Sequence, residues 1–322
     1  MIRYLALRLG HGVVILFGVS LLLFLLQQAA PGEFFTDAKL NPQISEETVK
    51  ALRAQYGMDQ PLPKRYARWL MSVVKGELGY SFAYNVSASS LLWPRALNTL
   101  LLTVPALIIS WLIAVPLGVL SAAWRGGWLD RFLSAGTSVL LALPDLLLAL
   151  LALVIAMRTN KFPVGGMHSL TAQEMGLWSR FTDLGWHMAL PVAVIVIGSL
   201  APILRQVRAS MSEVLDSPFM RAAQGHGLRK FTLLFRHALP AAANPLISLF
   251  GLSVAVLLSV GLLVEVVMSW PGIGPLLLEA IMGRDLFIVI GAVMLSTLLL
   301  VLGNLFADIL LYAVDPRIRV QA

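Results

Sequence analysis

The chain contains no cysteine and little charge. None of its 322 residues is cysteine, so the chain forms no disulfide bonds and no thiolate metal sites. Lys, Arg, Asp and Glu make up only 13% of the residues and hydrophobic residues make up 58%, far from the balance of an average soluble domain. The mean hydropathy is +0.82. A chain of this composition needs lipid as its solvent.

Two catalytic motifs are also missing. The sequence has no Gly-x-x-x-x-Gly-Lys-Ser/Thr loop to cradle ATP phosphates, and no His-Glu-x-x-His pair for an intramembrane metalloenzyme. The histidines are scattered, so at most a pair is expected to meet in space: His11, His168, His187, His226 and His237. We therefore expect a chain that is not an enzyme and holds no cofactor or metal of its own.

Several apolar runs are long enough to cross a bilayer as helices, since about 20 residues span the hydrocarbon core. The first apolar run follows a basic start, as the apolar part of a signal peptide does. The residues at its end, Gln27-Gln28-Ala29-Ala30-Pro31, make a poor cleavage site, so we expect this run to remain as the first span. The sequence predicts an all-α membrane protein with one transmembrane domain, 1–322. Its spans are expected at about Val13–Ala30, Asn98–Ala122, Phe132–Met157, His187–Leu204, Ala241–Met268 and Leu286–Tyr312.

The net charge of +7 could suggest nucleic acid, but in a membrane protein basic residues gather in cytoplasmic loops. Cations concentrate before the first span, around 125–131, in 205–240 and after the last span, so we expect both termini to face the cytoplasm and no nucleic-acid partner. The segment 31–95 also carries many cations, but it is too long for its charges to indicate which side of the membrane it occupies. We expect it to be a folded extracytoplasmic segment with short amphipathic helices near 46–55 and 65–75.

The longest internal loop, 205–240, carries the clearest pattern. Ser217-Pro218 predicts the start of a helix over Phe219–Gln224, Gly225 and Gly227 can end it, and a second amphipathic stretch follows over Lys230–Ala238. Composition alone leaves two interpretations open: a basic loop anchored to anionic headgroups, or a compact element that meets a partner.

The residue pattern of this loop resembles that of the cytoplasmic loop of permease subunits of binding-protein-dependent ABC importers. Their pattern is Glu-Ala-Ala, three residues, Gly, nine residues, Ile, one residue, Leu-Pro. Five residues match in register, and Arg221 and His237 replace the Glu and the Ile: Ala222, Ala223, Gly227, Leu239 and Pro240. The arginine is similar to what the dipeptide/oligopeptide/nickel branch carries; the histidine has no explanation in the sequence.

Other segments extend this resemblance over nearly the whole chain. Gly57-Met58-Asp59-Gln60-Pro61 looks like the extracytoplasmic segment of that branch, Ser269-Trp270-Pro271-Gly272-Ile273-Gly274 like the end of its fifth helix, and Asp315-Pro316-Arg317-Ile318-Arg319 like its C-terminus. The order and spacing of these motifs together make the resemblance specific.

The resemblance implies a type I ABC importer permease in the bacterial inner membrane. Its partners would be a second similar permease, two ATP-binding subunits that bind ATP and Mg, and an extracytoplasmic solute-binding protein. The loop would couple ATP hydrolysis to translocation through Arg221, Ala222, Ala223, Gly225, Gly227, Leu228, Leu239 and Pro240. The solute would be a di- or oligopeptide, with nickel chelates or glutathione as alternatives; an ion-coupled secondary transporter is the alternative from another class.

Ionisable residues inside spans are costly and often functional. Asp145 lies near the middle of the third predicted span, where it could line the passage and favour a cationic group, or could bond structurally to a neighbouring helix. Glu265 and Asp308 lie near span ends, where anchoring at the membrane interface is expected instead.

Overall fold

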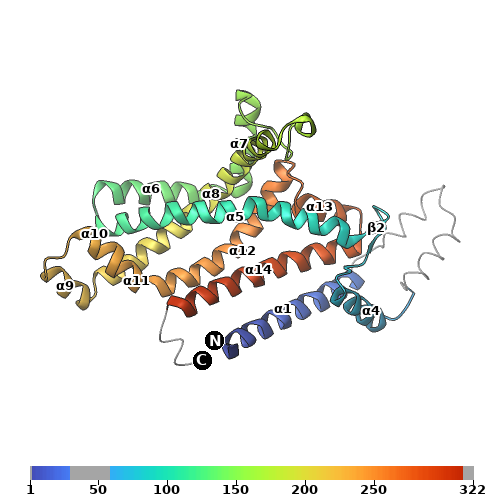
Figure 1. Ribbon diagram of the computed structural model, residues 1–322, viewed down its shortest axis with the longest axis horizontal. Helices are drawn as coiled ribbons and strands as arrows, with labels where there is room; N and C mark the ends of the chain where they lie inside the picture. Colours follow the sequence, from blue (N-terminus) through green and yellow to red (C-terminus); the bar gives the residue numbers. More distant parts are fainter. Residues whose placement is uncertain (1, 30–58, 315–322) are drawn as a thin grey trace. The chain divides into compact units, whose positions relative to one another are not determined.

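The computed structural model describes residues 2–29 and 59–314, and helices dominate it (Figure 1). The helix expected near 46–55 lies outside the described residues. The elements in chain order are α1 (Ile2–Ala29), α4 (Leu62–Val74), β1 (Tyr80–Ser81), β2 (Val86–Ser87), α5 (Ala88–Ala123), α6 (Trp128–Ala142), α7 (Asp145–Thr159), the 3-10 turn η1 (Ala172–Glu174), α8 (Leu177–Leu215), α9 (Pro218–Gly225), α10 (Lys230–Thr232), the π-helix η2 (Leu233–Ala238), α11 (Leu239–Ala241), α12 (Ala243–Val267), α13 (Ile273–Met282) and α14 (Leu286–Val314).

Among the described residues, five helices are long and apolar enough to cross a membrane: α1, α5, α8, α12 and α14. The pair α6 and α7 makes a sixth candidate, bent by 95° at the break between them. These helices confirm the expected all-α membrane fold of about six spans.

The third predicted span is wrong in its shape. We expected one continuous helix over Phe132–Met157, but the chain breaks at Leu143 and Pro144, between α6 and α7. Leu143 is extended (φ −90°, ψ 120°), as the ring of a following proline favours. Apolar residues flank the break on both sides, so hydropathy alone gives no sign of it.

Clustering of the contacts divides the chain into two compact units. The first comprises Met1–Leu9, Thr99–Trp270 and Leu300–Ala322. Within it, α8 packs against α6, α7 and α12. Small residues let α5 and α8 approach closely. The hydroxyls of Ser110 on α5 and Ser199 on α8 lie 2.8 Å apart, and both side chains are buried.

The second unit comprises Gly10–Asn98 and Pro271–Leu299. Its apolar cluster joins Phe24 of α1 and Trp69 of α4 to Leu286 and Ile290 of α14. The indole of Trp69 donates a hydrogen bond to the carbonyl of Leu78 (3.1 Å), which satisfies its polar atom inside the cluster. Helix α4 confirms the amphipathic stretch expected near 65–75.

A two-stranded antiparallel hairpin, β1–β2, leads into α5 within the second unit. Asp285 fixes it: its carboxylate accepts bonds from the Ser81 hydroxyl (2.6 Å) and the Ala83 amide (3.1 Å). In the hairpin turn, the Tyr84 hydroxyl donates to the Glu279 carboxylate of α13 (2.5 Å). This hydrogen bond, followed by burial and the negative charge of Glu279, raises the pKa of Tyr84 above its usual value.

Candidate functional site: the loop between α8 and α12

Helix α9 begins where the sequence predicts, at Ser217-Pro218. Ser217 is extended (φ −70°, ψ 152°) and its carbonyl accepts the first helical bond from the Arg221 amide (3.2 Å). Pro218 takes the first helical position, where its missing N–H removes no helical bond and its fixed φ is already suitable. Since α9 has only eight residues, its position depends on packing rather than on intrinsic helicity.

Helix α9 ends through a glycine in the left-handed region. Gly227 has φ +75°, which an L side chain rarely adopts, and no atom lies within 4 Å of the position a Cβ would take. Its amide donates to the Gln224 carbonyl (3.0 Å). The glycine is therefore required by the backbone conformation and not by lack of space.

The two faces of α9 differ sharply. Met220 is fully buried in an apolar cluster with Met211 of α8 and Leu233 of η2, and Ala223 packs against the edge of the cluster. Phe219 is 53% exposed, and Ala222 beside it is also exposed. One side of α9 is thus anchored in the first unit, while the other presents a small apolar surface.

Arg221 does not point out from this exposed surface. It lines a cavity together with Leu228, and its guanidinium reaches back to the carbonyl of Asp216 (3.4 Å). Gly225 closes α9 at its C-terminal end. Figure 1 shows α9 and α10 together at one end of the helices of the first unit.

Beyond α9, the predicted second stretch forms the short α10 and then a π-helix, Leu233–Ala238. A wider turn suits this place because Pro240 has no N–H and its ring crowds the carbonyl four residues before it. Leu239 and Pro240 begin α11, which runs into α12. His237 occupies the position of the Ile in the importer pattern. Its side chain is exposed, so an apolar residue is not needed at this position.

The loop itself is shorter than we expected. Helix α8 continues as far as Leu215, so the residues from 205 to 215 belong to a helix of 39 residues. Only 216–240 form the compact element.

An ion pair that the sequence did not reveal joins α6 to α8 near this element. Arg208 of α8 binds Asp130 of α6 through two bonds, Nε to Oδ1 (2.6 Å) and Nη2 to Oδ2 (2.9 Å). Asp130 also accepts bonds from the Ser121 hydroxyl of α5 (2.6 Å) and the Gly126 amide (2.9 Å). The Asp130 side chain is 6% exposed. One carboxylate therefore ties together the three helices beside the loop.

Asp145 is the first residue of α7, at the break and not in the middle of a continuous helix. A carboxylate at a helix N-terminus is favoured by the helix dipole. It is half-buried against α8, where a Cβ on Gly198 would lie 2.6 Å from its Oδ1. Gly198 thus permits the close approach of this side chain.

The two acidic residues expected at the membrane interface differ. Asp308 of α14 pairs with Arg8 of α1 (3.1 Å). Glu265 of α12 is fully buried, so our expectation of an interfacial anchor is wrong for this residue. Proximity to a span end did not indicate exposure here. Trp270, just past the end of α12, is fully buried as well, and its amide donates to the Glu265 carbonyl (2.9 Å).

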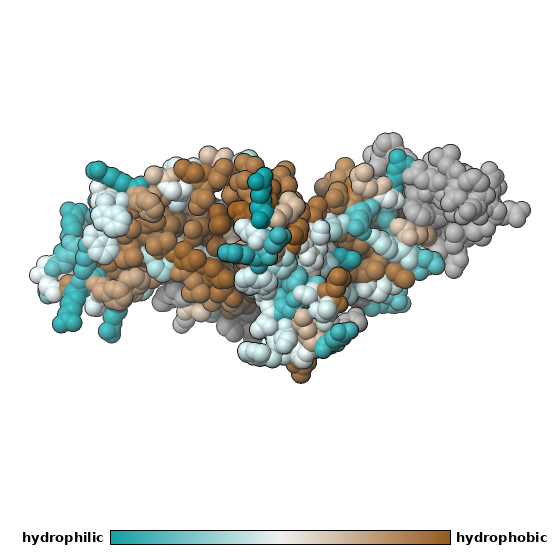
Figure 2. Space-filling model, turned by 90° about the horizontal axis from the view of Figure 1, so that it is seen from above, coloured by the Kyte–Doolittle hydropathy of each residue, from teal (hydrophilic) through white to brown (hydrophobic). Residues whose placement is uncertain are grey.

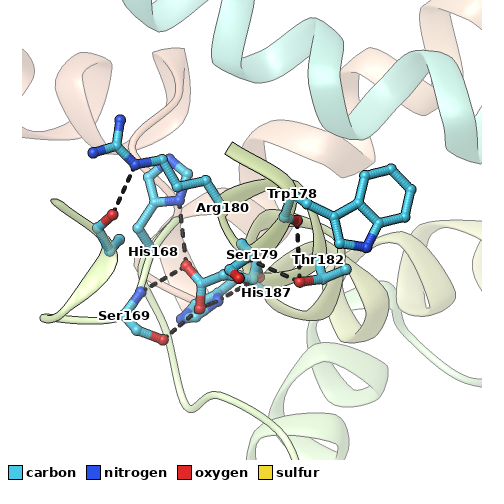
Figure 3. Close-up of polar contacts among 9 residues, drawn as sticks. His168, Ser169, Trp178, Ser179, Arg180, Thr182 and His187 are labelled. Atoms are coloured by element: carbon cyan, nitrogen blue, oxygen red, sulfur yellow. Dashed lines mark hydrogen bonds and ion pairs between the residues drawn. The ribbon is translucent and has the colours of Figure 1, made fainter. Parts of the chain in front are cut away.

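A second carboxylate with several partners, that of Asp183, lies near the other end of α8. Figure 3 shows His168, Ser169 and His187, which contact it. It accepts bonds from the Ser169 amide (3.0 Å) and the Ser169 hydroxyl, and the Nδ1 atoms of His168 and His187 both lie 3.4 Å from its oxygens. Arg180 adds a bond to the Ala172 carbonyl (2.9 Å). These contacts fasten the segment between α7 and α8 onto α8.

The order of groups at Asp183 does not suit nucleophilic catalysis. A serine nucleophile needs a histidine between itself and the acid, whereas here Ser169 donates directly to the carboxylate. His168 and His187 both contact this carboxylate. The described residues contain no group of three or more His, Cys, Asp or Glu residues that could hold a metal ion.

Comparisons with known proteins give the family. Residues 114–320 match the model of the binding-protein-dependent transport system inner membrane component, and residues 1–103 match the model of the N-terminal part of the same kind of membrane component. Together these matches cover nearly the whole chain.

Relatives match from end to end. A Brucella suis protein named as a peptide permease is 36% identical, over 99% of this chain and 100% of its own. The oligopeptide transport system permease protein AppB of Bacillus subtilis is 32% identical over 99% and 100%, and the dipeptide transport system permease protein DppB of Escherichia coli K12 is 32% identical over 99% of each chain.

One solved structure shares the fold. A chain of the MetNI methionine ABC transporter, in an inward-facing conformation, matches with a TM-score of 0.57 and 18% identity, over 70% of this chain and 96% of its own. A likeness at this identity concerns the fold alone. The family models and the full-length relatives carry the assignment: the chain belongs to the binding-protein-dependent transport system inner membrane components, the permease subunits of ABC importers.

Proposed function

We propose that this chain forms half of the channel of an ATP-driven importer of di- or oligopeptides. It would pair with a second permease, two ATPase subunits that bind ATP and Mg, and an extracytoplasmic binding protein that delivers the solute. Both termini and the compact element 216–240 would face the cytoplasm, and the segment 31–95 would lie outside.

The observation that carries the proposal is the two-sided packing of α9. Met220 is buried in the same cluster as residues of α8 and η2, so a push on the exposed side is transmitted to the helices of the first unit. Phe219 and Ala222 on the exposed side offer a bulky apolar contact beside a small one. Such a surface suits insertion into a groove of an ATPase subunit, whose closure would then shift the bundle between two arrangements.

Peptides are the preferred solute because the names of full-length relatives refer to peptide transport. Nickel chelates and glutathione stay alternatives within the same branch. An ion-coupled carrier is disfavoured by the family, whose description makes transport dependent on a binding protein.

The test is ATPase activity of the reconstituted transporter, with binding protein loaded with a dipeptide. We expect Gly227→Asp to reduce stimulation about tenfold or more, because a side chain strains the left-handed turn and a new carboxylate changes the charge beside α9. Gly166→Asp is the matched control: Gly166 also has positive φ (+82°) and open surroundings, but lies between α7 and α8. Equal loss in both variants, with the subunits still assembled, would contradict coupling through α9.

A further inference from the structure

A cavity of about 730 Å³ opens between α9 and the ends of α5 and α8. Its lining combines two chemistries. Three cations face it, Arg125, Arg221 and Lys230, and leucines of α8 and η2 supply much of the rest, among them Leu215, Leu233 and Leu234. A site that is cationic on one part and apolar on another suits an amphipathic anion.

The cations are not neutralised within this lining. Among the described residues of the lining, Asp216 is the one that is acidic. Arg125 pairs with it at 2.9 Å in a contact where both side chains are more than 60% exposed. Arg221 reaches only the Asp216 carbonyl, and Lys230 sits 4.2 Å from the centre of the Trp124 ring. Three positive groups against one carboxylate leave an excess of two positive charges around the cavity.

A hydroxyl donor is also available. The Oγ of Ser212, which belongs to the lining, is buried and has no hydrogen-bond partner in the described part of the chain. A buried polar atom without a partner is uncommon in native proteins. A phosphate oxygen entering the cavity would supply an acceptor for it.

Exposed aromatic residues follow the end of α5 that lines the cavity. The apolar helix α5 ends at Ala123, and the next residues include Trp124, 47% exposed, and Trp128, 79% exposed. Tryptophan prefers the headgroup region, and one turn further Phe132 is 69% exposed, as a lipid-facing residue would be. Figure 2 shows hydrophilic residues gathered at the end where α9 and α10 lie, beside a broad hydrophobic surface.

We propose that this cavity binds the phosphate headgroup of an anionic phospholipid from the inner leaflet. Arg125, Arg221 and Lys230 hold the phosphate, and an acyl chain lies along the leucines. The bound lipid braces α9 against the ends of α5 and α8. The proposal rests on the cytoplasmic orientation proposed above, but not on coupling to an ATPase.

The alternative occupant is an acidic segment of an ATPase subunit. The lipid fits better because the cavity is lined with leucines and opens beside exposed tryptophans, whereas the exposed contact surface of α9 is on its other side, at Phe219 and Ala222. The two occupants make different predictions when the ATPase subunits are added.

The experiment is native mass spectrometry of the full-length chain, released from bilayers that contain equal amounts of phosphatidylglycerol and phosphatidylcholine. We expect one phosphatidylglycerol to stay bound. Arg221→Gln and Lys230→Gln each lower its retention about fivefold, the effect of one cation near an anionic surface. Arg221→Lys keeps it. Arg131→Gln is the matched control, since Arg131 is an exposed cation of α6 outside the cavity.

Four results would overturn the proposal. The first is equal retention of the two lipids by wild type, and the second is unchanged retention when Arg221 and Lys230 are both replaced by Gln. The third is release of the lipid by excess inorganic phosphate, which would assign the site to free phosphate. The fourth is release when the ATPase subunits bind, which would assign the cavity to the partner. Because the first three measurements need no ATPase, failed coupling and failed lipid binding stay distinguishable.

Discussion

Two carboxylates, Asp130 and Asp183, lie near opposite ends of α8 and gather similar numbers of donors, but their cationic partners differ. Asp130 holds a guanidinium, with 6% and 32% of the two side chains exposed. Asp183 faces two imidazoles, and one of them, His168, is 42% exposed. Arginine stays charged at any physiological pH, whereas histidine is charged only when protonated.

The difference teaches which end of α8 is built to stay fixed. Near the loop, three helices share one permanently charged, bidentate contact. Near Asp183, the bonds join α8 to the irregular segment before it, and the histidine contacts are longer. We infer that the end near the loop moves as one body and that the segment between α7 and α8 opens more readily.

The largest effect is expected from Asp130→Ala. The substitution leaves Arg208 partly buried without its carboxylate, which should cost about 3 kcal/mol, the lower end for broken buried pairs because Arg208 can still be partly hydrated. Thermal unfolding of the purified chain measures it. Asp216→Asn is the control, since its pair with Arg125 is exposed and should be worth at most about 1 kcal/mol. Similar destabilisation by both would show that burial does not strengthen the Asp130 pair.

Asp183→Asn should have the next largest effect. The carboxylate accepts several bonds, and loss of its charge weakens each, by about 1.5–3 kcal/mol in total. We expect hydrogen exchange to speed up in the segment 160–176 while the amides of α9 keep their protection. Faster exchange at both ends of α8 would show that the two ends are not independent.

His168→Gln should also destabilise the segment 160–176, but by less than Asp183→Asn. The side chain is 42% exposed and its contact with Asp183 is 3.4 Å long, so the expected change is about 0.5 kcal/mol. His187→Gln is the informative comparison, because His187 is 7% exposed and its Nδ1 also donates to the Asp183 carbonyl (2.9 Å). Hydrogen exchange of the segment 160–176 should rank the His187 variant above the His168 variant; the reverse order would contradict this geometry.

The smallest effect concerns a third acid–donor contact, Tyr84 with Glu279. Because the pKa of Tyr84 is raised in the folded chain, the contact stabilises below the ordinary tyrosine pKa of about 10 and is lost as the pH rises through the folded value. Tyrosinate absorbance, compared with Tyr84→Phe, isolates this residue. Glu279→Gln should move its titration to lower pH; an unchanged curve would mean that the hydrogen bond does not form.

The sequence predicted the parts of this fold that local pattern controls. Apolar runs gave the spans, the Ser217-Pro218 pair gave the start of α9, and Gly227 gave its end. These features depend on a few neighbouring residues, and each has a physical reason that can be stated without a partner elsewhere in the chain.

The sequence did not predict the features that join distant residues. Asp130 and Arg208 are 78 positions apart, and only the fold brings them together. A first-turn Asp after Gly126-Gly127 was a usable signal for Asp130, but nothing in the sequence named its partner. The break at Pro144 was missed because an apolar run reads the same whether it is straight or bent, and this error also misplaced Asp145 within its helix.

The length of α8 has a mechanical consequence. Its 39 residues make a rod of about 58 Å, nearly twice the thickness of the hydrocarbon core. A tilt of about 10° around its midpoint would move each end by about 5 Å, in opposite directions. A small rotation imposed beside α9 would therefore reach the Asp183 end as a displacement comparable to one helical turn, without any change in the helix itself.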